Sequence, residues 1–432
     1  MTEFIQRRKT FFDSMLDNSM AIFTSNQEFT RSKDTEFRFR QNSDFYYLSG
    51  FKEPEACLLL IKKNNQTSTV LFNRKKDKHA EIWHGYRLGQ EAALTDLAVD
   101  SAFAIDDFEQ KLGELLVDVD CIYYPVLSGE TTDQPLQNVL NNLRSKTRSG
   151  LIKTNQFLDW QPQVHEMRMF KSEAEKQLMR KAGEISALGH LRAMQKCKPG
   201  MFEFQLQLEV EYEFAKQGTR DIAYNSIVAG GNNACILHYT ENDQILQDGD
   251  LVLIDAGAEY QGYAGDITRT FPVNGRFSKE QAIIYQLVLD CQLFAIDQVK
   301  AGISMLEINK LMVVKMTQGL LDLGILKGDL ETLIENDAHR DFYMHGLGHP
   351  LGLDVHDVGD VGTVANPRPL QAGMAITIEP GIYISKDADV EARWKGIGIR
   401  IEDDLIVTES GCEIMTSAVP KTIQEIEALM HG

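Results

Sequence analysis

Cysteine is scarce in this 432-residue sequence, and no two cysteines form a C-x-x-C pair. The six are spread along the chain, at Cys57, Cys121, Cys197, Cys235, Cys291 and Cys412. Scattered cysteines without a paired motif are typical of reduced thiols rather than of a disulfide framework. We therefore expect a cytoplasmic protein.

Long apolar segments are also lacking. No uninterrupted apolar run approaches the roughly 18 residues that a transmembrane helix requires. The N-terminal stretch MTEFIQRRKTFFDSM has no apolar core of the kind found in secretory signals. We therefore expect neither a membrane span nor a secretory leader.

Net positive charge is the third absence. The 63 Asp and Glu residues outnumber the 44 Lys and Arg residues, which gives a formal net charge of -19 at pH 7. Such a balance argues against nucleic acid or an anionic membrane as the main partner. One basic run, residues 74–78, is expected to be a solvated face.

The composition is that of an ordinary globular protein, and the length predicts two domains. We assign residues 1–168 to an α/β accessory domain, in which residues 56–61 and 69–72 are predicted strands and residues 136–143 have helical apolar spacing. Its three histidines, His79, His84 and His165, form no cluster with carboxylates in the sequence.

Residues 169–432 carry an internal repeat. A capping box at residues 172–175 opens a predicted helix that runs to about Cys197, and a second helix spans Glu203–Gln217. The same pattern returns with helices over residues 279–299 and 305–323. Each helix pair precedes a strand that ends in a carboxylate, so we predict an α+β catalytic domain made of two related halves.

The first of these strands, residues 250–254, is followed by a turn and a second predicted strand over residues 263–271. A turn centred at residues 260–261 would place Asp255 opposite Asp266, with Cβ atoms roughly 5 Å apart. Like charges so close destabilise a hairpin unless a cation lies between them. Taken alone, this stretch favours two solvated turn carboxylates over a metal site.

The second half of this domain shifts the interpretation toward a metal site. Residues 373–379 repeat residues 249–255: each stretch has a glycine, five further residues and a carboxylate, Glu379 in place of Asp255. A later predicted strand carries Glu402. Two hairpins that face each other would bring four carboxylates to one point.

Histidines are concentrated between residues 345 and 356. His345 and His349 are four residues apart, but three glycines and Pro350 make a helix improbable, and no glutamate completes an H-E-x-x-H motif. We therefore place these histidines on a loop or strand. Four carboxylates and one neutral imidazole carry a charge of about -4, which matches two divalent cations. Oxygen-rich ligation favours Mn²⁺, and Zn²⁺ or Co²⁺ remain open.

With these carboxylates and histidines, the sequence resembles the pita-bread metallopeptidases, the family of methionine aminopeptidase, prolidase and aminopeptidase P. The residues that match its five metal ligands are Asp255, Asp266, His349, Glu379 and Glu402. Residues 30–34, 40–51 and 81–85 resemble the N-terminal domain of bacterial aminopeptidase P. The resemblance spans nearly the whole chain and implies a pita-bread catalytic domain with an internal pseudo-twofold repeat.

The resemblance also implies roles for the ligands. Asp255 would chelate one metal ion, Asp266 and Glu402 would bridge, and His349 and Glu379 would hold the other. Glu379 would also carry a proton from the bridging water, or hydroxide, to the leaving nitrogen.

Further residues are assigned by the same resemblance. His238 and His356 would contact the substrate near the scissile bond and its oxyanion, and His345 would line the pocket. Tyr383 and Arg400 would steady carboxylate ligands, although a purely structural role is an equal alternative for both.

Two residues of the first domain resemble groups that reach a neighbouring subunit's active site: Trp83 and, more weakly, Arg148. A structural role for Arg148 is equally open. The family implies a homo-tetramer or dimer.

The activity implied is release of the N-terminal residue from peptides with proline in second position. The alternatives are a prolidase, which takes Xaa-Pro dipeptides, and a non-catalytic pita-bread binding protein. Retention of all five ligands argues against the latter.

Overall fold

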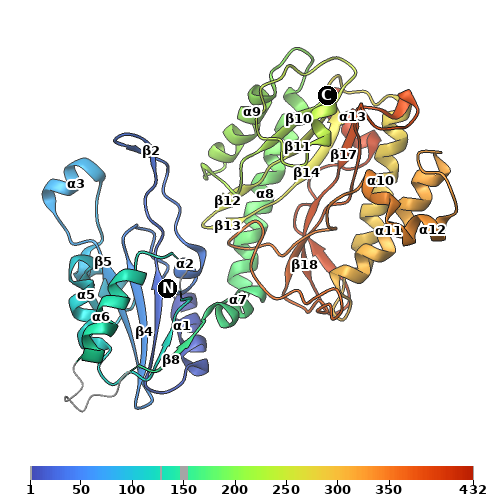
Figure 1. The fold of residues 1–432 in the computed structure, drawn as a ribbon. Coiled ribbons are helices and arrows are strands. Elements are labelled where there is room, and N and C mark those ends of the chain that lie inside the picture. Colours follow the sequence, from blue (N-terminus) through green and yellow to red (C-terminus); the bar gives the residue numbers. More distant parts are fainter. Residues whose placement is uncertain (1, 127–128, 146–153, 432) are drawn as a thin grey trace. The chain divides into compact units, whose positions relative to one another are not determined.

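The computed structural model describes residues 2–126, 129–145 and 154–431. The chain divides into two compact units, residues 1–168 and 169–432, and each is described by itself (Figure 1). Among the described residues, no helix is long and apolar enough to cross a membrane.

The first unit is built on a six-stranded mixed sheet in the order β6-β5-β4-β1-β7-β8. Its strands are β1 Ser19–Thr24, β4 Cys57–Lys63, β5 Gln66–Asn73, β6 Ser101–Ala104, β7 Cys121–Tyr123 and β8 Gln156–Leu158. Its helices are α1 Thr2–Ser14, α2 Ser43–Ser49, α3 Lys78–His84, α4 Gly89–Asp96, α5 Phe108–Leu115 and α6 Asp133–Ser145, and α7 spans Gln161–Met169. The two strands and the helix predicted in this part of the sequence are confirmed.

Alternate residues of β1 explain why both faces of this sheet are covered. Met20 and Ile22 pack with α5 and α6 in one apolar cluster, whereas Phe23 packs against Phe11 of α1, with ring centroids 5.5 Å apart. A short hairpin, β2 Thr30–Ser32 and β3 Thr35–Glu36, and α3 extend from the sheet (Figure 1).

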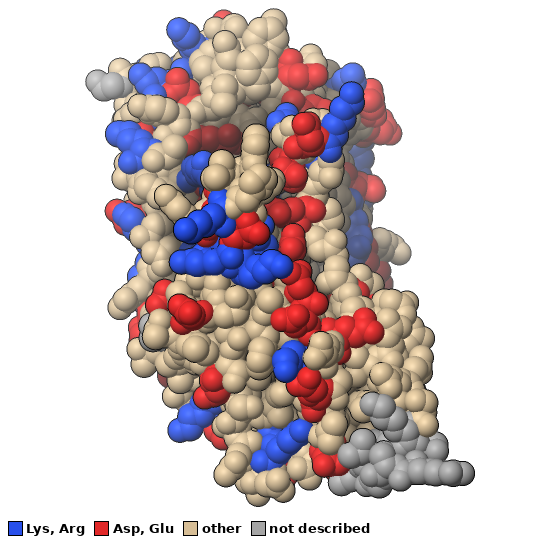
Figure 2. All heavy atoms as spheres, turned by 90° about the vertical axis from the view of Figure 1, so that its left-hand side faces the viewer, with Lys and Arg blue, Asp and Glu red and all other residues tan. Residues whose placement is uncertain are grey.

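The basic run at residues 74–78 is only partly the solvated face that was expected. Lys75 is exposed and pairs with Asp106, 2.9 Å away. Arg74 is mostly buried and lies 3.5 Å from Glu53, so the expectation is wrong for this residue. Figure 2 shows acidic and basic side chains interspersed on one face of the molecule, rather than one continuous basic surface.

The second unit contains the four predicted helices, each within a residue or so of its expected bounds. They are α8 Glu173–Lys196, α9 Glu203–Lys216, α10 Lys279–Gln298 and α11 Met305–Asp322; α12 Leu330–Glu335 and α13 Ile423–His431 complete the set. The predicted capping box is present, because the Ser172 hydroxyl accepts from Glu175 N and the Glu175 carboxylate accepts from Ser172 N. Ser278 and Ser304 begin α10 and α11 in the same way, which satisfies backbone donors that a helix start leaves free.

Two sets of strands lie between these helix pairs (Figure 1). The first comprises β9 Asp221–Ile222, β10 Ile227–Gly230, β11 Leu251–Asp255, β12 Ala258–Tyr260, β13 Tyr263–Ala264 and β14 Thr268–Pro272. The second comprises β15 Ala375–Ile378, β16 Gly381–Ile384, β17 Ile397–Arg400, β18 Asp403–Val407 and β19 Cys412–Ile414. One apolar core joins all four long helices to both sets, so the predicted repeat of helix pair and hairpin is present.

The first hairpin differs from its predicted register. Asp255 lies opposite Thr268, not opposite Asp266, so that prediction is wrong by two residues. The cause is the turn, which is centred on Gln261 and Gly262, both with positive φ; this geometry is typical of a two-residue hairpin turn. Asp266 is thereby the diagonal neighbour of Asp255, still within reach of it.

The second hairpin pairs its two carboxylates directly. Ile378 lies opposite Asp403 in one ladder, and Gly381 lies opposite Arg400 in the next. Both ladders have the same register, which places Glu379 opposite Glu402 between them. The two halves therefore share a helix pair followed by a hairpin but present their carboxylates differently.

Candidate metal centre and active site

The five candidate ligands line one cavity of the second unit, with a volume of about 550 Å³. Three of them approach closely: a ligand atom of Asp266, one of His349 and one of Glu402 all lie within 4.8 Å of one another. His349 Nε2 lies 3.5 Å from Asp266 Oδ2 and 3.6 Å from Glu379 Oε1. Tertiary structure thus gathers side chains that span almost 150 positions of the sequence.

Strand ends aim these side chains into the cavity. Asp255 is the last residue of β11, Glu379 follows β15, and Glu402 lies between β17 and β18. His349 comes from residues 342–374, which are all described and contain neither helix nor strand, so the predicted absence of a helix is confirmed. This segment is tied to β15, because Thr377 N donates to His349 O over 2.9 Å.

A glycine makes that attachment possible. A Cβ atom on Gly348 would lie 2.0 Å from Thr377 O, far inside van der Waals contact. Only a residue without a side chain permits this approach of two backbones. Gly348 therefore sets where His349 meets the carboxylates.

Burial and mutual repulsion disfavour ionisation of the clustered carboxyl groups. Burial raises the pKa of Asp266, and the charge of Asp255 adds to the effect. Burial likewise raises the pKa of Glu379 to about 7, and that of Glu402 well above its usual range. Divalent cations among these oxygens would offset the repulsion.

Tyr224 lies between two of the carboxylates. Its hydroxyl is 2.5 Å from Asp255 Oδ1 and also contacts Asp266 Oδ1. A phenol has one hydrogen to donate, so it cannot satisfy both oxygens as ionised acceptors. Two carboxylate oxygens that contact the same hydroxyl are close enough to bind one shared cation.

His349 presents its free nitrogen to the same point. Its Nδ1 donates to Pro350 O over 2.9 Å, which leaves Nε2 directed toward Asp266 and Glu379. Burial lowers the pKa of His349, but the hydrogen bond and charge of Asp266 and the charge of Glu379 outweigh it and raise the pKa to about 9. Nε2 is therefore a strong cation-binding position, for a proton or for a metal ion.

Arg400 connects the two hairpins. Its Nη2 donates to Asp255 Oδ2 over 2.6 Å and its Nε to Thr268 Oγ1 over 3.1 Å. Thr268 Oγ1 in turn donates to Glu402 Oε2 over 2.7 Å. Arg400 thus fixes the orientation of one carboxylate directly and of another through Thr268.

Tyr383 reaches the carboxylates through Arg400. Its hydroxyl accepts from Arg400 Nη1 over 3.0 Å and donates to His345 Nε2 over 2.7 Å. The direction is fixed because His345 Nδ1 donates to Gly346 O over 2.8 Å. This chain of bonds holds His345 at the cavity wall, and burial lowers its pKa to about 4, so the ring stays neutral at pH 7.

The other two candidate histidines lie at the open side of the cavity. His238 and His356 are both exposed and both line it. The His356 ring packs against the His349 ring, with centroids 4.2 Å apart. Both are therefore accessible to a ligand that enters beside the candidate metal ligands.

A buried glutamate, Glu203, fixes the loop that carries His238. Its carboxylate is fully buried and accepts hydrogen bonds from Gly230 N, Asn233 Nδ2, Tyr239 O–H and Gln244 N, at 2.8, 3.0, 2.8 and 3.0 Å. One side chain of α9 therefore ties together both ends of a segment of about fifteen residues.

Glu203→Ala is expected to loosen this segment, because it leaves up to four donors without an acceptor. Each unsatisfied buried donor costs about 1–3 kcal/mol. Hydrogen exchange over residues 230–244 should accelerate, and the melting temperature should fall. Glu209→Ala, which removes only a partly exposed ion pair with Arg192, is the control and should leave that exchange unchanged.

The remaining two assigned residues are Trp83 and Arg148. Trp83, on α3 of the first unit, is 73% exposed. Arg148 lies outside the described residues. Their assignment to a neighbouring subunit's site stays a prediction.

Sequence reasoning missed Tyr224 and Thr268. Tyr224 precedes β10 in an irregular segment with no motif around it, so no local signal marks it. Thr268 lies two residues after Asp266. The predicted register placed Asp266 opposite Asp255, so it did not indicate that Thr268 takes that position.

Comparisons with known proteins agree with this geometry. Residues 177–409 match metallopeptidase family M24, and residues 4–123 match the aminopeptidase P N-terminal domain. The chain is 50% identical to the Xaa-Pro aminopeptidase of Escherichia coli (strain K12) over 429 residues, 99% of this chain and 97% of that protein.

Solved structures give the same result. The fold is similar to that of Zn-substituted aminopeptidase P of E. coli in complex with product (TM-score 0.97, 50% identity, 100% of this chain and 98% of that chain). It is also similar to proline aminopeptidase P II from Yersinia pestis (TM-score 0.98, 52% identity, 100% and 99%). The second unit has the pita-bread fold. The chain therefore belongs to metallopeptidase family M24, in the group that carries an aminopeptidase P N-terminal domain.

Proposed function

We propose that this chain is a metal-dependent Xaa-Pro aminopeptidase, which releases the N-terminal residue from peptides with proline in second position. The observation that carries the proposal is the convergence of four carboxylates and His349 in one cavity, within a chain 50% identical to a protein of that name. Family membership alone would leave the substrate open, because M24 scaffolds host several specificities.

Asp255, Asp266, His349, Glu379 and Glu402 are proposed to hold two divalent cations. Oxygen-rich donors with one imidazole suit Mn²⁺, and Zn²⁺ or Co²⁺ are alternatives. When bound, such a pair would polarise the scissile carbonyl and activate water.

The side chains around the ligands have separate tasks in this proposal. Glu379 faces the cavity and accepts and returns the proton that the leaving nitrogen requires. His238 and His356, exposed at the open side, bind the substrate near the scissile carbonyl. Arg400 and Tyr383 hold Asp255 and His345 in place through the bonds described above.

The proposed preference for proline in second position has a physical basis. An Xaa-Pro bond has no amide hydrogen, and the ring fixes φ near −65°. A pocket shaped to that bend gains affinity because little conformational entropy remains to be lost. Rejection of other residues must then come from pocket shape, since no donor is available at the nitrogen.

Xaa-Pro-Yaa tripeptides are expected to lose Xaa at least ~10-fold faster than Xaa-Ala-Yaa, a discrimination that pocket shape can supply. The measurement is kcat/KM on matched peptides after chelation and separate addition of Mn²⁺, Co²⁺ or Zn²⁺. Chelated protein should be inactive. Equal rates on both peptides would contradict the specificity, and cleavage of dipeptides alone would indicate a prolidase.

We further propose that the domain boundary lies at residues 168–169, where the two compact units meet in sequence. The first unit would act in self-association, with the chain as a tetramer or dimer in which Trp83 of one protomer covers the active site of another. The exposure of Trp83 supports this, since large exposed apolar side chains often mark interfaces. A cytoplasmic location is proposed from the six cysteines, all described and all unpaired.

Trp83→Ala is expected to raise KM for peptides longer than three residues by ~10-fold or less, the scale of one apolar contact, while metal content stays unchanged. Light scattering gives the oligomeric state in parallel. Leu208→Ala, an exposed apolar residue on α9, is the control. An unchanged KM for long peptides would remove Trp83 from the site.

A further inference from the structure

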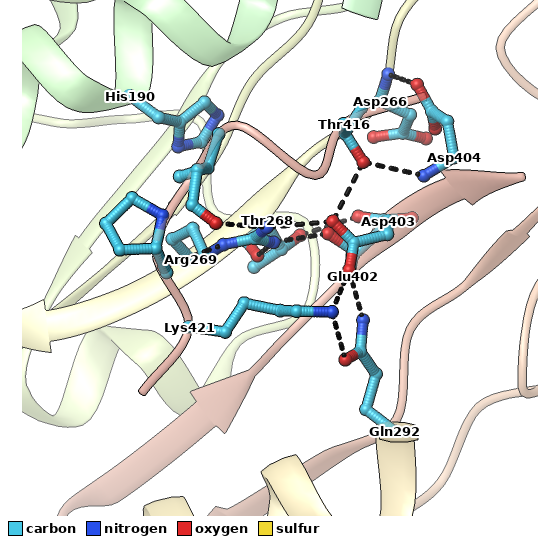
Figure 3. Close-up of polar contacts among 12 residues, drawn as sticks. His190, Asp266, Thr268, Arg269, Gln292, Glu402, Asp403, Asp404, Thr416 and Lys421 are labelled. Carbon is cyan, nitrogen blue, oxygen red and sulfur yellow. Dashed lines mark hydrogen bonds and ion pairs between the residues drawn. The ribbon is translucent and has the colours of Figure 1, made fainter. Parts of the chain in front are cut away.

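We propose that Arg269, Asp403 and Lys421 are positioning residues for the ligand carboxylates Asp266 and Glu402. Residues 416–421, near the C-terminal end of the sequence, would then form part of the metal centre. The proposal rests on the metal site of the proposed function. It concerns a buried network behind the carboxylates, shown in Figure 3.

Arg269, on β14, is the centre of this network. It is fully buried, and its five N–H groups have five acceptors. Nη1 donates to Thr268 O and Glu402 O, Nη2 to Asp403 Oδ1 and Val419 O, and Nε to Pro420 O. One planar group therefore fixes the main chain at Glu402 relative to β14 and to the C-terminal segment.

Asp403 is the second anchor and is fully buried as well. Its Oδ1 accepts from Arg269 Nη2 and from Thr416 Oγ1, each over 2.8 Å. Its Oδ2 accepts from Gln292 Nε2 over 2.8 Å and from Lys421 Nζ over 2.7 Å. Because all these partners are in place, the residue after Glu402 has little freedom to rotate.

The geometry of extended chain explains how this anchor acts on the ligand. Successive side chains of an extended segment point to opposite faces. Glu402 points into the cavity, and Asp403 points away from it into the network (Figure 3). Rotation at Asp403 would therefore swing the Glu402 carboxylate.

The second ligand is held by the next residue. Asp404 Oδ2 accepts from Asp266 N over 2.9 Å, and Asp404 N donates to Thr416 Oγ1 over 3.1 Å. Thr416 thus joins the anchor of Glu402 to that of Asp266. Asp266 and Glu402 would need a fixed separation to hold a pair of divalent cations, and this shared support positions both from outside the cavity.

The test makes two measurements on each full-length variant. Titration calorimetry gives the affinity of the metal-free protein for Mn²⁺, and electron paramagnetic resonance gives the signal of the spin-coupled Mn²⁺ pair. Asp403→Asn keeps the shape but places an N–H₂ group opposite donors. Lys421→Met removes one cation at a partly exposed position, and Lys421→Arg restores it. Arg276→Met removes an ion pair with Glu427 elsewhere in the same unit and is the control.

Asp403→Asn and Lys421→Met are expected to weaken Mn²⁺ binding by about 10–100-fold and to alter the coupled signal. Lys421→Arg should recover most of the affinity, and Arg276→Met should match the wild type. Affinity within twofold of wild type and an unchanged signal in Lys421→Met would overturn the proposal, even if Asp403→Asn failed to fold. A wild-type protein that bound none of Mn²⁺, Zn²⁺ and Co²⁺ would instead overturn the proposed function on which it rests.

Discussion

Glu402→Ala is expected to abolish peptide hydrolysis and to weaken metal binding by more than ~100-fold, beyond the 10–100-fold typical of groups that only support a ligand. Glu402 lies opposite Glu379 and within 4.8 Å of Asp266 and His349, measured between ligand atoms. Its loss would remove a carboxylate proposed to contact both cations. Thr268 would also lose its acceptor.

Metal content by atomic spectroscopy and kcat/KM on an Xaa-Pro-Yaa peptide are the two measurements. Glu409→Ala, an exposed glutamate a few residues further along the chain, is the matched control and should behave as wild type. Near-normal turnover by Glu402→Ala with two bound ions would refute the assignment of Glu402 as a ligand.

His356→Ala and His238→Ala are expected to lower kcat by about 10²–10³ while the protein retains its metal. Both rings line the cavity from its exposed side. A donor directed at a developing oxyanion acts mainly in the transition state, so kcat should fall more than KM rises.

His431→Ala, which removes an exposed imidazole on α13, controls for nonspecific loss of a histidine. Metal analysis separates the two possible roles. If either cavity variant were purified without metal, that histidine would be a ligand rather than a substrate contact.

The sequence permitted a close prediction of the helices because their signals are local. Ser172 and Glu175 are three residues apart, and their reciprocal bonds depend on that spacing alone. Likewise, glycines and Pro350 excluded a helix around His349, and residues 342–374 contain none.

Register was harder to predict than element type. The hairpin after β11 was placed two residues out of register, because the turn centre depends on positive φ at Gln261 and Gly262. A shift of the turn by one residue moves every pair by two. Asp255 and Asp266 still lie within reach of the same Tyr224 hydroxyl.

The sequence by itself determined which side chains are available: four carboxylates on or beside strands and a histidine outside any helix, in an order that marks the family. Tertiary structure alone decided what supports them. Arg400 meets Asp255 across 145 positions, and Arg269 meets Pro420 across 151. No pattern of neighbouring residues encodes such pairs, because they form only when the two halves pack and each buried donor must find an acceptor.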